Sequence, residues 1–171
     1  RIERAGGEGA VVTGYRDRTG LNISYIDLSG PNAKLAASEL LPNRYESEGR
    51  SHAFIARIDG KGDGIMGIPT REQFWKGGRW VWDSEDSDIS YITLTGGKSL
   101  SPVGELKQGM TSSDSDYDCE VSCVDWYGNA RPIFTGGRTF GLMGTSLVEG
   151  AVTNGKMEEK RRVDLTGRLD H

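Results

Sequence analysis

The sequence predicts an all-β protein made of antiparallel four-stranded meanders, which together form part of a β-propeller. Its 171 residues include 25 glycines and only 35% hydrophobic residues, a composition typical of many short strands separated by turns. Residues 23–40 and 89–106 also match at eight of eighteen positions without a gap. A strand-turn-strand unit that is reused at wide spacing is typical of modular sheet architectures.

The first predicted group of strands covers residues 10–41. Its strands are expected at residues 10–15, 21–28 and 35–41. Residues 33–40 are the one candidate helix, but they match the proline-containing stretch 98–106, which argues against a helix. This group therefore has three strands and lacks a fourth, and residues 41–49 are expected to form an exposed loop.

Two further groups are predicted, at residues 52–106 and 119–165. Strands of the second group are expected at residues 52–58, 65–68, 80–82, 89–94 and 103–106. Strands of the third group are expected at residues 121–126, 131–135, 139–152 and 157–165. Asn154-Gly155 is a strong signal for a two-residue hairpin turn. Residues 112–118 are expected to form an exposed loop.

The three groups form one unit over residues 1–171, with a β-sandwich or an irregular β-barrel as the alternatives. Closed propellers have about four to eight blades, whereas this chain supplies two to three. Because exposed sheet edges are normally avoided, the remaining blades are expected from another chain, an oligomeric partner or missing sequence. The chain opens with Arg1 rather than Met, so we expect a fragment of a longer protein.

Charge and hydropathy exclude two classes of partner. The net charge of −4 gives no electrostatic sign of nucleic-acid binding, which needs a clustered basic surface. Apolar runs fall well short of the roughly 18 to 20 residues of a membrane span.

Cys119 and Cys123 lie about 13 Å apart if their segment is an extended strand, so they are either two buried residues or a disulfide formed across a bulge or turn. A zinc site would need further Cys or His ligands, and only His52 and His171 exist, so zinc is not expected.

Two acidic segments are candidates for binding calcium. Asp59 and Asp63 occupy alternate positions of a Gly-rich loop, although Lys61 stands where a third oxygen ligand is expected. Asp114, Asp116 and Asp118 likewise alternate, and residues 85–88 add a further acidic group. A plain hairpin turn and solvated loop acids are the alternative interpretations.

The candidate catalytic residues are Glu48 and His52. A histidine titrates near neutral pH and a neighbouring carboxylate, Glu48 or Glu46, can orient it. Ser51 lacks the glycine-flanked turn of a hydrolase nucleophile. A structural histidine at the start of a strand is the alternative.

Aromatic residues at turns are the candidate ligand-binding residues, because an indole or phenol offers a large contact area and a polar group. They are Trp75, Trp126 and Tyr127. Trp80 and Trp82 lie two residues apart on one strand face and are expected to pack between blades.

The runs at residues 44–54, 64–70 and 119–131 resemble the C-terminal part of large secreted bacterial β-propeller-domain proteins. The resemblance implies an exported protein, secreted or periplasmic, with more blades before Arg1, and it brings no catalytic residues. We therefore expect a non-catalytic binding or scaffold module that presents loops to a protein or glycan. The alternative is a hydrolase or lyase whose central-channel site is completed by other blades.

Overall fold

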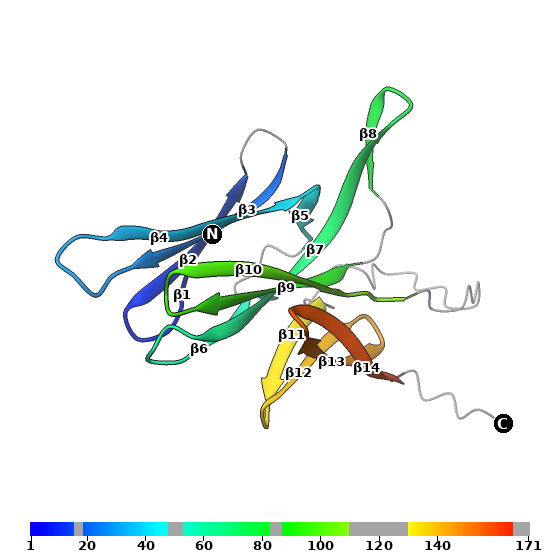
Figure 1. Cartoon of the computed structure of the whole chain (residues 1–171). Helices are drawn as coiled ribbons and strands as arrows, with labels where there is room; N and C mark the ends of the chain where they lie inside the picture. The colour runs from blue at the N-terminus through cyan, green and yellow to red at the C-terminus, as the bar shows by residue number, and fades with distance from the viewer. Residues whose placement is uncertain (16–18, 48–52, 83–86, 110–129, 166–171) are drawn as a thin grey trace.

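The computed structural model describes residues 1–15, 19–47, 53–82, 87–109 and 130–165. Strands make up 72% of these residues, which confirms the all-β prediction, and every strand pairing is antiparallel. The strands form three sheets in chain order, which we call the first, middle and last sheets (Figure 1). No apolar helix long enough to cross a bilayer occurs in the described ranges.

The first sheet has the order β1-β2-β3-β4. Its strands are β1 (Ile2–Arg4), β2 (Gly9–Tyr15), β3 (Gly20–Asp27) and β4 (Lys34–Pro42). β1 is the fourth strand that the sequence pattern lacked: three residues are too short for a clear alternation, and their pairing with β2 fixes them. β4 confirms that residues 33–40 do not form a helix.

The middle sheet is built around the thirteen-residue strand β7 (Gly64–Lys76). On one side β7 pairs with β5 (Arg44–Glu46) and β6 (Ile55–Ile58), and on the other with β8 (Arg79–Trp82) and β9 (Asp88–Thr95). The last strand, β10 (Ser99–Leu106), pairs with β9. The loop expected at residues 41–49 is wrong at residues 41–42, which belong to β4, and at residues 44–46, because pairing with β7 makes them a strand.

The β7–β8 hairpin extends away from the rest of the molecule (Figure 1). Its turn consists of Gly77 and Gly78, with φ of 60° and 80°. Positive φ at both central residues is the requirement of a type I′ turn, which glycine meets without strain. The hairpin therefore continues β7 beyond the end of the sheet.

The last sheet has the order β11-β12-β13-β14. Its strands are β11 (Ala130–Thr135), β12 (Arg138–Met143), β13 (Ser146–Thr153) and β14 (Lys156–Asp164). The single strand expected at residues 139–152 is wrong, because a turn at Gly144, with φ of 56°, divides it into β12 and β13. The strand expected at residues 121–126 lies outside the described residues.

The third and fourth strands of each sheet share one irregularity. The register between β3 and β4 shifts after Tyr25, and that between β9 and β10 shifts at the corresponding Tyr91. Between β13 and β14 it shifts after Glu149. In each case the fourth strand carries one extra residue, a β-bulge that increases the local twist. The bulge therefore aligns Tyr25, Tyr91 and Glu149 across the three sheets.

Two hydrophobic clusters join the sheets. The first packs Leu21, Ile23 and Tyr25 of the first sheet against Met66, Ile68, Ile92 and Leu94 of the middle sheet. The second packs Ile89, Tyr91 and Leu106 of the middle sheet against Met143 and Val148 of the last sheet. The middle sheet is thus buried on both faces, which explains why residues 89–92 of β9 are all buried, without alternation.

Both joints use equivalent faces. Ile23 and Tyr25 face the next sheet along the chain, and so do Ile89 and Tyr91, their counterparts in the repeat. We call the face that carries these positions the front face of a sheet, and the opposite face its back face. Because neighbouring residues of a strand point to opposite faces, Ile92 lies on the back face of the middle sheet, where it packs against the first sheet.

Candidate functional site

Trp75 and Trp80 form an exposed aromatic pair near the tip of the β7–β8 hairpin. They are direct cross-strand partners, and their ring centroids lie 5.4 Å apart in an edge-to-face arrangement. Trp75 is 59% exposed and Trp80 37%. Trp80 was expected to pack between blades; this is wrong, because the hairpin carries it beyond the sheet. Nothing is described for the side chain of Trp82.

The hairpin tip is also basic. Lys76 and Arg79 pair across the strands next to the glycine turn, and both are exposed. Residues 73–81 include no acidic side chain, in a chain whose net charge is −4. The tip therefore combines two indoles with two cations, a combination that suits contact with sugar rings, aromatic groups or anionic groups.

The geometry of the pair favours binding over packing. An edge-to-face pair holds each indole in a defined orientation, so little side-chain entropy is lost when a ligand covers it. Aromatic residues are enriched at binding interfaces relative to the rest of a protein surface. We take the hairpin tip, defined by Trp75, Lys76, Arg79 and Trp80, as the candidate functional site.

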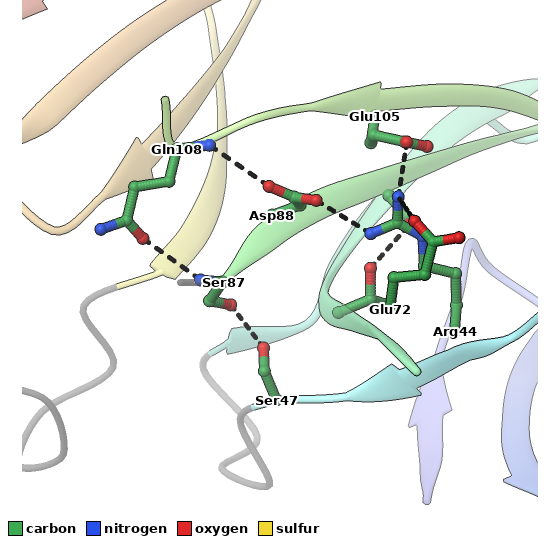
Figure 2. Close-up of polar contacts among 9 residues, drawn as sticks. Arg44, Ser47, Glu72, Ser87, Asp88, Glu105 and Gln108 are labelled. Atoms are coloured by element: carbon green, nitrogen blue, oxygen red, sulfur yellow. Dashed lines mark hydrogen bonds and ion pairs between the residues drawn. The ribbon is translucent and has the colours of Figure 1, made fainter. Parts of the chain in front are cut away.

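A second polar cluster surrounds Arg44 of β5 (Figure 2). The guanidinium lies 2.9 Å from Asp88 of β9, 2.5 Å from Glu105 of β10 and 3.5 Å from Glu72 of β7. The Arg44 side chain is only 9% exposed, whereas the three carboxylates are 18 to 40% exposed. One arginine therefore links β5, β7, β9 and β10 of the middle sheet.

Further hydrogen bonds continue this cluster to the chain segments beside it. Gln108 donates its backbone N–H to Asp88, at 3.3 Å, and accepts from the backbone N–H of Ser87, at 3.2 Å. The hydroxyls of Ser87 and Ser47 bond to each other (Figure 2). Since Asp88, Glu105 and Glu72 surround the guanidinium, Arg44 holds strands together rather than offering its charge to a ligand.

The sequence offered no signal for this cluster, because Arg44 lies 44 residues from Asp88 and 61 from Glu105 along the chain. Glu105 belongs to the repeated stretch, yet its counterpart Glu39 is exposed. The repeat therefore preserves the strands but not this interaction.

The turn that carries Asp59 and Asp63 uses both carboxylates as hydrogen-bond acceptors. Asp59 Oδ1 accepts from the backbone N–H groups of Lys61, at 2.8 Å, and Asp63, at 3.0 Å. These bonds lower the pKa of the Asp59 carboxyl. Asp63 Oδ1 accepts from the backbone N–H of Gly96, at 2.7 Å, and so joins this turn to the β9–β10 turn. The arrangement favours the hairpin-turn interpretation of the loop.

The other candidate site residues lie in parts of the chain that the structure does not describe, so their roles remain predictions. Glu48, His52, Asp114, Asp116, Asp118, Cys119, Cys123, Trp126 and Tyr127 lie outside the described residues. Glu46 is described: it accepts a hydrogen bond from Thr13 Oγ1 at 2.8 Å and lies 4.0 Å from Arg1. Within the described ranges, no group of three or more His, Cys, Asp or Glu side chains is arranged to hold a metal ion.

Comparisons of the chain with protein-family models, with curated proteins and with solved structures give no match.

Proposed function

We propose that this chain is an exported, non-catalytic binding or scaffold module built from β-propeller blades, and that the hairpin tip contacts its protein or glycan ligand. The observation that carries the binding proposal is the exposed pair of Trp75 and Trp80 on a hairpin that projects from the sheets. Lys76 and Arg79 favour a ligand with anionic groups.

Three regularities of the fold support the blade interpretation. Each sheet is an antiparallel meander with four rows of strands. Each carries a bulge between its third and fourth rows. The sheets pack face to face in chain order, with equivalent faces at both joints. Radial repetition of one four-stranded unit is the building rule of propellers.

The binding proposal is tested by measuring the affinity of the full chain for arrays of neutral and acidic glycans and for immobilised acidic peptides. The best ligand found is then titrated against wild type and the double variant Trp75→Ala/Trp80→Ala. We expect at least a tenfold loss of affinity, because truncating a central aromatic residue of an interface costs about 2 kcal/mol.

The matched control is Val152→Ala, since Val152 is 40% exposed on a different sheet. Both variants are expected to keep the wild-type melting midpoint, because these side chains contribute little to the core. A ligand that binds the double variant as tightly as wild type would remove the hairpin tip from the binding site.

A further inference from the structure

None of the residues that the structure describes covers the back face of the first sheet. Strand alternation and register place five large aliphatic residues on it, opposite the hydrophobic cluster. They are Ile2, Val12, Ile26, Leu35 and Leu40. Ile2 is 74% exposed, Leu35 66% and Leu40 38%, while Val12 and Ile26 are half-buried. A sheet face with this many exposed apolar residues is typical of an interaction surface.

The internal repeat indicates what kind of structure covers this face. Ile26 corresponds to Ile92, which lies on the back face of the middle sheet and is fully buried against the first sheet. The following apolar position of the repeat is Leu28, 47% exposed, whereas its counterpart Leu94 is 1% exposed. The back face of the first sheet thus has the residues of a face that packs against a preceding sheet.

Three polar residues near the centre of this face are already compatible with burial. Asn22 donates to Ser24 Oγ at 3.1 Å, Ser24 and Ser38 share a hydrogen bond of 3.1 Å, and Ser38 donates to Asn22 at 3.3 Å. Covering the face would therefore leave few polar groups without partners, so that the apolar contacts are not offset by desolvation.

In the described part of the chain, the front face of the last sheet is likewise left uncovered. The shared bulge aligns Leu147 with Ile23 and Ile89, both of which face the next sheet. Leu147 pairs with Leu142 on one side and with Val163, 41% exposed, on the other, which makes an apolar row across the sheet. Beside this row Arg138 binds both carboxylate oxygens of Glu149, so its charge is paired.

We propose that the front face of the last sheet of one copy packs on the back face of the first sheet of a second copy. The same contact occurs twice in a two-fold symmetric dimer, and the two copies together stack six sheets in a closed ring. This inference rests on the blade interpretation proposed above. Six lies within the range of about four to eight blades of closed propellers, and closure removes both uncovered faces.

A second copy fits both uncovered faces at once. Each joint within the chain brings a front face to a back face, and the described residues leave one face of each kind uncovered. A ring of two copies uses both, and the new joint repeats the geometry of the two internal joints.

The test measures the mass of the full chain by light scattering at about 100 μM and physiological salt, where surface charges are largely screened. We expect twice the 18.6 kDa of one chain. Leu35→Glu and Leu147→Arg, made separately, are each expected to give the single-chain mass. Mixing the two variants should restore the double mass, because one joint of the mixed dimer is wild type and the other brings Glu against Arg.

Val163→Arg replaces Leu147→Arg if circular dichroism shows that the latter fails to fold. Wild-type protein of single-chain mass would overturn the inference, and so would a dimer that survives both variants or two variants that do not rescue each other. The Trp75→Ala/Trp80→Ala variant separates this inference from the binding proposal. This variant should keep the double mass. If the wild-type protein is monomeric but still binds ligand through the hairpin tip, the dimer proposal is wrong and the binding proposal stands.

Discussion

Arg44 shows how much a single charged residue contributes when its partners come from three other strands. We expect Arg44→Met, which keeps the length of the side chain, to lower the free energy of unfolding by roughly 2 to 3 kcal/mol. This is somewhat less than the cost of breaking a fully buried pair, because the carboxylates left behind are partly exposed. Urea unfolding at pH 7 measures the change.

The control for this substitution is Arg138→Gln. Arg138 also binds a carboxylate in a two-pronged contact, but its side chain is 56% exposed, so water replaces much of the lost interaction. We expect its unfolding midpoint to stay close to wild type. If both arginine variants lose equal stability, burial is not what makes the Arg44 cluster important.

Because Tyr91 is buried, we expect the stability of the protein to fall at alkaline pH. Burial raises the pKa of its hydroxyl above the ordinary value of 10.0, so the unfolded chain releases this proton more readily than the folded chain. Stability contributed by the neutral hydroxyl is therefore present below pH 10 and falls above it, by about 1.4 kcal/mol per pH unit. Tyr91→Phe removes this dependence and also the hydrogen bond to the carbonyl of Phe140, at 2.9 Å, which costs about 1 kcal/mol at pH 8.

Urea unfolding at pH 8 and pH 11 tests this expectation. The difference between wild type and Tyr91→Phe should shrink as the pH rises. Tyr15→Phe is the comparison, because the Tyr15 ring is 54% exposed and its removal should leave most of the alkaline loss in place. An equal loss of stability in wild type and Tyr91→Phe would mean that the Tyr91 hydroxyl ionises freely in the folded state.

At the scale of elements, a substitution in the turn between β6 and β7 distinguishes a hydrogen-bonded turn from a calcium-binding loop. Asp59→Ala removes the acceptor of two backbone N–H groups, so we expect a lower melting midpoint both in chelator and in added calcium. Because the pKa of Asp59 is lowered in the folded state, the stability that its ionised carboxylate contributes is lost as the pH falls below about 3.8. If calcium raises the midpoint of wild type but not of Asp59→Ala, the ion binds at this turn.

Most strands could be predicted from local patterns, and the exceptions share a cause. β2, β3, β4 and β14 follow apolar and β-branched patterns bounded by turn residues, which are local properties of the sequence. β1 and β5 have three residues each, too few to show a pattern, and become strands only through their partners β2 and β7. The break at Gly144 was missed because the apolar pattern continues across it.

The sequence indicated that exposed aromatic residues would form the candidate site, but it did not show that Trp80 belongs to it. Exposed aromatic residues beside glycines pointed to Trp75, whereas Trp80 was assigned to the core because alternation identifies a strand face without saying what covers it. The strand β7 continues beyond its partners β5, β6 and β9, and this tertiary feature leaves both indoles in solvent.

At the scale of the whole molecule, the two copies of the repeat form the third and fourth strands of two sheets, and the structure shows that these copies face equivalent directions. Ile23 and Ile89 occupy equivalent buried positions at successive joints. The last sheet has no recognisable copy of the repeat, yet it keeps the bulge at Glu149. Backbone geometry is therefore shared across all three sheets, while side-chain identity is shared across two.

The stacking also predicts how the molecule loosens. Ile89 and Ile92 lie on one strand and are both fully buried, but Ile89 packs toward the last sheet and Ile92 toward the first. Replacing either by Ala is expected to cost about 2 to 4 kcal/mol. Because stacked units are stabilised mainly by their nearest neighbours, Ile89→Ala should speed amide hydrogen exchange chiefly in β11 to β14, and Ile92→Ala chiefly in β1 to β4. Hydrogen exchange read by mass spectrometry distinguishes the two patterns, and the same pattern in both variants would show instead that the three sheets unfold as one cooperative unit.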